Sequence, residues 1–138
     1  MTRKNGKSIV ISDASIKKSN EISMAKLNKG LTLNQMQLLS YAIFSTQKNG
    51  ATVFHKADFE KQFNIDEYRT NHAKVDSERL LDLKVSTVDL ANDCFEFLNV
   101  FTRMTYKKGT FLFKWNEEFI PHILDLKNRY IINDLTVT

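Results

Sequence analysis

Cysteine, proline and glycine are all scarce in this chain of 138 residues, which has one cysteine, one proline and four glycines. The lone Cys94 has no partner for an internal disulfide, so we expect a reducing, intracellular compartment and a Cys94 side chain that serves as buried packing. So little proline and glycine leaves little room for long flexible linkers. The apolar runs are too short to cross a bilayer, and the amino terminus lacks the apolar segment of a secretory signal. These absences favour one intracellular globular domain without membrane contact.

The sequence also lacks the motifs of common catalytic classes. His55, His72 and His122 are too widely separated to form a His-hydrophobe-His metal motif, and no Cys/His spacing resembles a zinc site. No glycine-rich phosphate loop is present. The adjacent Glu117 and Glu118 would face different directions on a helix, and the positive end of a helix dipole explains them better than an acid/base pair does. We therefore predict that the protein is not an enzyme and uses no cofactor and no metal.

Acidic side chains are outnumbered only at the amino end of the chain. Residues 1–30 hold seven basic and two acidic side chains, a balance of +5, whereas the other 108 residues hold 13 basic and 14 acidic ones, a balance of −1. We expect residues 1–16 to form a basic, partly disordered arm, and Lys17 and Lys18 just after it to contact phosphate. A solvated terminus without any partner explains the same charges equally well.

The clearest helix is predicted over residues 31–47. Thr32 and Gln35 form a capping-box pattern, in which each side chain satisfies the backbone N–H of the other residue. Apolar residues recur at the 3.6-residue period and give a wide apolar face. We expect this face to lie in the core, although a face this wide also suits a subunit contact.

The next elements are a short strand at 52–54, a short helix at 56–63, and a longer helix that begins at Tyr68 or Asn71 and ends at Leu83. A short helix, a short turn and a longer helix make the helix-turn-helix arrangement. The residues expected to be buried on the longer helix are Val75, Leu80 and Leu83.

The charges on this longer helix are balanced. Basic and acidic side chains between residues 67 and 84 oppose one another one for one, so a helix lying on DNA would meet phosphate repulsion along part of its length. We therefore expect contact with the DNA backbone rather than strong base reading, made by the amino-terminal part of the helix. The residues expected to make this contact are Arg69, Asn71, His72 and Lys74.

The stretch from Phe95 to Trp115 is typical of a β-hairpin. Two runs of aromatic and β-branched residues flank a short turn that contains Gly109. We predict one continuous first arm over 95–106 and a second arm over 110–115 with its aromatic residues on one face. A basic tip suits phosphate contact, although charged tips also keep ordinary hairpins soluble. The basic residues at or near the tip are Arg103, Lys107 and Lys108.

A helix, a helix-turn-helix and then a β-ribbon follow one another in the order of a winged helix. We therefore predict an α+β fold of the winged-helix type. A last helix is expected after Asn116, which can cap it, with Pro121 either in the first turn or at a bend.

Three segments of the sequence resemble the Rep initiator proteins of theta-replicating bacterial plasmids. They are KSNE at 18–21, LTLNQMQLLSYAI at 31–43 and FLFKWNEEFIPHILDLK at 111–127. The resemblance implies that residues 17–138 are the first of two winged-helix domains, with the second expected beyond Thr138. In this family the second domain is the main reader of repeated origin sequences. The first domain adds DNA backbone contacts and forms much of the dimer interface.

The resemblance implies a replication initiator that acts in the bacterial cytoplasm by binding alone, with copy-number control and autorepression as further roles. The implied partners are double-stranded origin DNA, a second copy of the chain in a homodimer, and host replication proteins. Two alternatives stay open. One is a protein-interaction module that dimerises and has little DNA affinity, which the near-neutral balance of residues 31–138 favours. The other is a winged-helix transcription regulator outside this family.

Overall fold

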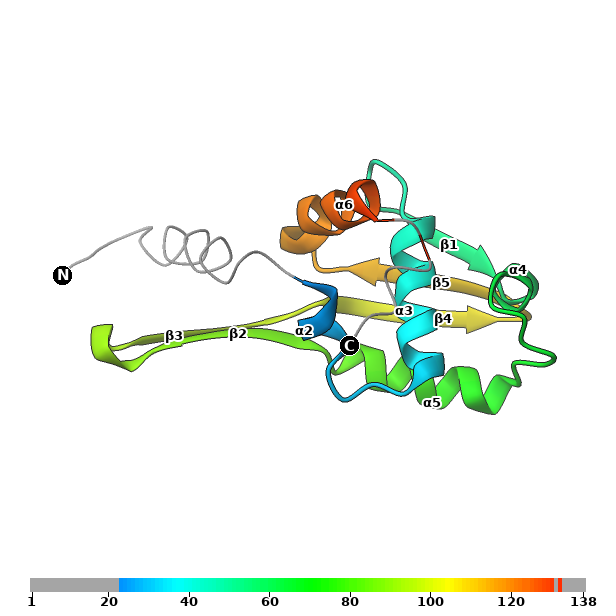
Figure 1. The fold of residues 1–138 in the computed structure, drawn as a ribbon, viewed down its shortest axis with the longest axis horizontal. Helices are drawn as coiled ribbons and strands as arrows, with labels where there is room; N and C mark the ends of the chain where they lie inside the picture. Colours follow the sequence, from blue (N-terminus) through cyan, green and yellow to red (C-terminus); the bar gives the residue numbers. More distant parts are fainter. Residues whose placement is uncertain (1–22, 131, 133–138) are drawn as a thin grey trace.

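Helices alternate with short antiparallel strands in the computed structural model of the chain, which describes residues 23–130 and Ile132 (Figure 1). The predicted arm at 1–16, together with Lys17 and Lys18, lies outside the described residues.

The order of the elements matches the sequence prediction from the central helix to the end of α5, and again from β5 to the last helix. Strands β1, β5 and β4 form one antiparallel sheet in that order, while β2 pairs only with β3 in a separate two-stranded ribbon. A helix, a strand, a helix-turn-helix and two more strands of the same sheet make an α+β winged helix, as predicted. The elements are α2 (Met24–Asn28), α3 (Leu33–Ser45), β1 (Thr52–His55), α4 (Lys56–Gln62), α5 (Thr70–Leu81), β2 (Lys84–Asp89), η1 (Leu90–Asn92), β3 (Cys94–Asn99), β4 (Phe101–Lys107), β5 (Thr110–Trp115), η2 (Glu117–Phe119) and α6 (Ile120–Arg129).

Helix α3 lies across one face of the sheet (Figure 1). It begins with the predicted capping box: the Thr32 hydroxyl accepts the Gln35 backbone N–H at 3.2 Å, and Gln35 Oε1 accepts the Thr32 N–H at 3.0 Å. Most of its apolar face is buried in the core, as the first of the two interpretations predicted, although Leu33 and Phe44 are 60% and 48% exposed. The fully buried apolar residues of this helix are Leu38, Leu39, Ala42 and Ile43.

Aromatic side chains fill the space between α3 and the sheet. Phe111, Phe113 and Trp115 alternate along β5 and are all buried, as the sequence predicted. The Trp115 indole N–H donates to the hydroxyl oxygens of Thr46 and Thr52, at 3.0 and 2.8 Å. Thr46 follows α3 and Thr52 begins β1. The hydrogen bonds of one indole N–H therefore join the central helix to strands β1 and β5.

Asp76 is the one buried carboxylate among the described residues. It lies on the inner face of α5 and accepts hydrogen bonds from the Tyr68 hydroxyl at 2.5 Å and from Gln35 Nε2 at 3.1 Å. Burial, and then the hydrogen bond to Asp76, raise the pKa of Tyr68 far above its ordinary value. These contacts tie α5 to the start of α3 and to the segment that leads into α5.

The first arm of the predicted hairpin is not one strand, and this part of the prediction was wrong. The chain changes partner at Val100: β3 before it pairs with β2, and β4 after it pairs with β5. Val100 is fully buried, its N–H donates to Leu83 O at 3.0 Å, and its carbonyl accepts the Asn116 N–H at 2.8 Å. These two bonds pull the chain into the body at a single residue. The β2–β3 ribbon therefore projects far from the rest of the fold (Figure 1).

The burial predictions for Cys94 and Val75 were wrong. Cys94 at the tip of the projecting ribbon is only half-buried, and Phe95 and Phe97 beside it are 65% and 59% exposed. Val75 is 56% exposed because Asp76 takes the inward position on α5 instead. Leu80 and Leu83 are buried as predicted.

The carboxy-terminal helix follows the sequence signals. The Asn116 side chain accepts the Glu118 N–H at 3.1 Å and so caps η2, the short turn of helix before α6. Pro121 lies in the first turn of α6, where its missing N–H costs no hydrogen bond.

Replacing Tyr68 with Phe should lower the free energy of unfolding by about 1–3 kcal/mol, because the buried Asp76 carboxylate loses a donor. Tyr41→Phe is the matched control, since Tyr41 is half-buried in the core and its hydroxyl makes no hydrogen bond within the described residues. Urea unfolding at neutral pH measures both variants. Equal losses in the two variants would contradict a stabilising role for the Tyr68–Asp76 bond.

The raised pKa of Tyr68 also predicts a loss of stability in alkali. The folded protein keeps the phenol proton above pH 10.0, where the unfolded chain releases it, so this contribution is complete below that pH and falls away as the pH rises further. The free energy of unfolding should drop by about 1.4 kcal/mol per pH unit on account of Tyr68. Urea unfolding between about pH 9 and about pH 11 tests this against Tyr68→Phe, which should show a shallower decline. Identical slopes would refute it.

Candidate nucleic-acid interface

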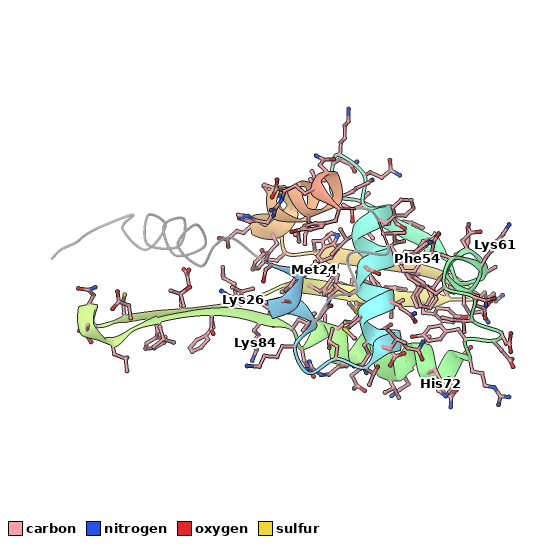
Figure 2. The ribbon with its side chains drawn as sticks, viewed as in Figure 1. Met24, Lys26, Phe54, Lys61, His72 and Lys84 are labelled. Carbon is pink, nitrogen blue, oxygen red and sulfur yellow. The ribbon has the colours of Figure 1, made fainter. Side chains whose placement is uncertain are left out.

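The amino-terminal part of α5 is exposed, as the sequence predicted. Arg69 is the residue before the helix, and Asn71, His72 and Lys74 lie in its first turns with their side chains toward solvent. Figure 2 shows His72 on the outer side of α5, away from the core. The Asn71 side-chain oxygen accepts the His72 backbone N–H at 3.0 Å, which occupies that oxygen locally.

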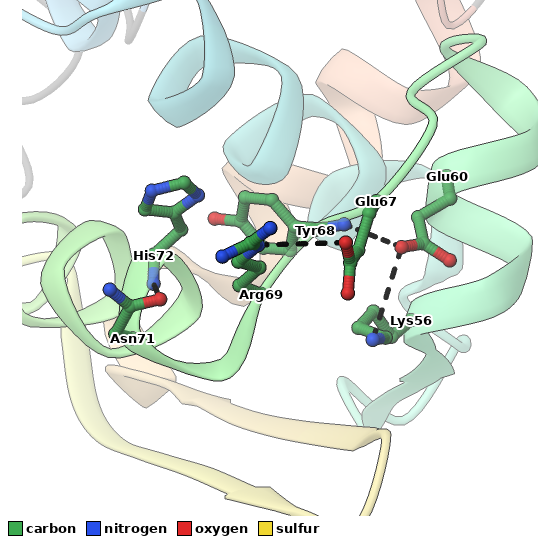
Figure 3. Close-up of polar contacts among 7 residues, drawn as sticks. All are labelled: Lys56, Glu60, Glu67, Tyr68, Arg69, Asn71 and His72. Atoms are coloured by element: carbon green, nitrogen blue, oxygen red, sulfur yellow. Dashed lines mark hydrogen bonds and ion pairs between the residues drawn. The ribbon is translucent and has the colours of Figure 1, made fainter.

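Carboxylates offset the cations of this helix. Arg69 Nε lies 3.5 Å from Glu67 Oε1 (Figure 3), and Lys74 Nζ lies 3.8 Å from Glu78 Oε1. All four side chains are largely exposed, so each pair contributes at most about 1 kcal/mol and a phosphate can displace it. The same carboxylates nevertheless weaken the local positive potential, which agrees with the balanced charge of this segment in the sequence.

The start of α5 is fixed against α4 by one carboxylate. Glu60 Oε2 accepts the Tyr68 backbone N–H at 2.6 Å and lies 3.9 Å from Lys56 Nζ (Figure 3). Because the Tyr68 hydroxyl also donates to Asp76, the turn of the helix-turn-helix is anchored through both the backbone and the side chain of Tyr68. Arg69 is thereby placed next to a rigid residue.

The wing is the β4–β5 hairpin, and its turn is short. Lys108 and Gly109 have φ angles of 47° and 86°, and Lys107 pairs with Thr110, so the loop has two residues, both left-handed. The Gly109 carbonyl accepts the Lys56 backbone N–H at 2.7 Å, which fixes the turn against the start of α4. Lys107 and Lys108 are exposed and have no carboxylate partner among the described residues.

Arg103 lies on the face of the sheet that points away from the helices. Its cross-strand partner is Lys114, another exposed cation. The sequence prediction did not include Lys114, because only the apolar face of the second arm was considered. The signal was available: alternation along 110–115 with its aromatic residues inward places Lys114 outward.

The structure brings two of the predicted regions together. A groove of about 360 Å³ runs between α5 and β4 and is lined by Thr70 and Lys74 on one side and Thr105 and Tyr106 on the other. The cationic start of α5 and the strand that leads to the wing turn therefore border one surface. Arg103 and Lys114 face away on the outer side of the sheet, and Lys17 and Lys18 lie outside the described residues.

Two features are absent from the part of the chain that the structure describes. Within residues 23–130 and Ile132, no three His, Cys, Asp or Glu side chains come close enough to hold a metal ion. In the same part of the chain, none of the helices combines the length and the apolar character that crossing a membrane requires.

A family of known proteins matches most of the chain. Residues 15–138 match the family described as Initiator Replication protein, WH1, which is a winged-helix, DNA-binding family and not a catalytic one. No curated protein matches the chain. The family match covers most of the sequence, including the helix-turn-helix, the ribbon and the wing. The chain therefore belongs to the initiator replication protein family, as the amino-terminal winged-helix domain of a plasmid replication initiator.

Proposed function

We propose that this domain binds the phosphate backbone of duplex DNA at a plasmid origin and performs no chemistry of its own. The distribution of free cations supports the proposal: Lys107 and Lys108 in the wing turn are unpaired among the described residues, whereas Arg69 and Lys74 on α5 face carboxylates. Contact through cations alone gives affinity without sequence information. Reading of the origin repeats would then fall to the second winged-helix domain expected beyond Thr138.

The wider roles in this proposal come from the family. The protein would act in the bacterial cytoplasm, recruit host replication proteins to the origin, and repress its own gene, thereby limiting plasmid copy number. No further residue of this chain is assigned to these roles.

Dimerisation is the second proposed activity, and the β2–β3 ribbon is its proposed surface. Val88 pairs with Phe95, and both side chains are mostly exposed on the same face as Phe97, whose ring centroid lies 5.5 Å from that of Phe95. An isolated two-stranded ribbon is only marginally stable in water, and exposed clustered aromatics mark interaction surfaces. A second copy of the chain that packs on this face would cover the aromatics and stabilise the ribbon.

Reversing the charge of the wing turn with Lys107→Glu and Lys108→Glu should weaken binding to a duplex of arbitrary sequence. It should also flatten the plot of log affinity against log salt by about 0.9 for each phosphate that the variant no longer neutralises. Lys29→Glu with Lys61→Glu is the matched control, because both are exposed cations that the proposal leaves uninvolved and the net charge changes equally; Figure 2 shows Lys61 on the outside of α4. Absence of binding by the unaltered chain at low salt would overturn the backbone contact.

Replacing Phe95 and Phe97 with Ser should convert a dimer to a monomer, because the pair loses the apolar area that a partner would cover. Leu33→Ser with Val75→Ser is the control, since these residues are equally exposed but lie on helices. Sedimentation velocity at several concentrations gives the mass of each variant. A dimer that survives the ribbon substitutions would place the subunit contact elsewhere.

A further inference from the structure

The outer face of the β1–β5–β4 sheet carries positive charge and no negative charge on its strands. The three strands contain no acidic residue, and their outward positions include three cations. Arg103 and Lys114 form one cross-strand pair, and Lys107 lies four residues further along β4 opposite Thr110. None of the three cations has a carboxylate within ion-pair distance among the described residues.

The pairing of Arg103 with Lys114 is unfavourable for the fold taken alone. Like charges directly opposite each other across antiparallel strands repel, and neighbouring strands lie only about 4.8 Å apart. No aspartate or glutamate on the same strands relieves this repulsion. An anion bound between the two side chains would relieve this repulsion. The pairing of Arg103 with Lys114 therefore favours the binding of an anionic partner.

The shape of this face also suits a partner. A hollow of about 740 Å³ lies over the sheet, and its lining includes Arg103, Lys114 and Leu112. The cross-strand pair of Thr105 and Leu112 separates the Arg103–Lys114 pair from Lys107, and Val53 on β1 lines the same hollow on the other side of Leu112. Glu117 is the single acidic residue in the lining, and it lies beyond the strands, just before α6.

We propose that this outer sheet face is a second phosphate-binding surface for duplex DNA, in which Arg103 and Lys114 together hold one backbone phosphate and Lys107 contacts another. The proposal deepens the proposed function and rests on it. Four residues along a strand place Arg103 roughly 13 Å from Lys107, at about 3.3 Å per residue. That separation matches the width of the DNA major groove, about 12 Å, so the two phosphates would border one groove. Thr105 and Leu112, the pair between the cations, carry no charge and would face the groove between the two phosphates.

This assignment changes which side of the domain faces DNA. The groove between α5 and β4 has Glu78 in its own lining, whereas the strands of the outer sheet face have no carboxylate. A phosphate backbone meets less repulsion on the sheet than on the helix that usually reads DNA in a winged helix. The polar side chains of this face include cations and threonine hydroxyls, which are groups that contact phosphate.

Salt-dependent binding of this 138-residue chain to a duplex of about 20 base pairs with arbitrary sequence tests the proposal. Arg103→Gln with Lys114→Gln should flatten the plot of log affinity against log salt by about 0.9, the value for one phosphate, and by more if the two cations contact separate phosphates. Lys29→Gln with Lys61→Gln removes the same charge elsewhere and should leave the slope unchanged. The Arg103 and Lys114 double variant should also resist urea at least as well as the unaltered chain, because it relieves the like-charge pair.

The possible results distinguish the outer-face proposal from the proposed backbone contact on which it rests. If the unaltered chain binds with a clear salt dependence but the Arg103 and Lys114 variant keeps the full slope, the outer face is overturned while backbone contact stands. If the control pair flattens the slope as much, only general charge matters and the outer face is again overturned. If the unaltered chain does not bind at low salt, backbone contact itself fails and the outer face falls with it.

Discussion

The buried carboxylate of Asp76 is the constraint on which the helix-turn-helix depends. A carboxylate inside a core is costly unless donors surround it, so Tyr68 and Gln35 must both reach it from different elements. Gln35 already belongs to the capping box that starts α3, and the Tyr68 backbone is held by Glu60 of α4. One buried polar group therefore fixes three helices relative to one another. The outward direction of the first turns of α5 follows from that arrangement.

Charge distinguishes the two sides of the domain that a winged helix can present to DNA. At the start of α5 the predicted cations Arg69 and Lys74 each lie within ion-pair distance of a carboxylate. The positive and negative charges of the helix therefore nearly balance. On the wing and the outer sheet the cations are unpaired within the described residues, and two of them repel each other across the strands. A domain built in this way is suited to holding phosphate and poorly suited to reading bases. The proposed division of labour, in which this domain holds phosphate and a second domain reads the sequence, requires a charge distribution of this kind.

Local patterns in the sequence predicted most of the fold, because its signals lie within short segments. The capping box at Thr32 and Gln35, the helix-turn-helix and the short turn that contains Gly109 each depend on neighbouring residues. The switch of partner at Val100 could not be predicted in the same way, since no glycine or proline marks it and the bonds that cause it come from Leu83 and Asn116. The exposure of the ribbon aromatics follows from that same long-range switch. The inward direction of the Asp76 side chain likewise could not be predicted from neighbouring residues, because it depends on residues distant in sequence.

The central claim is that the domain meets DNA through its wing and outer sheet. Its most direct test is a titration of the isotope-labelled chain with a duplex of arbitrary sequence, followed by amide chemical shifts at low salt. The account predicts that the shifts change along β4 and β5 and at the turn around Lys108, with small changes in the middle of α5. Shift changes confined to α5, with the sheet unaffected, would contradict it.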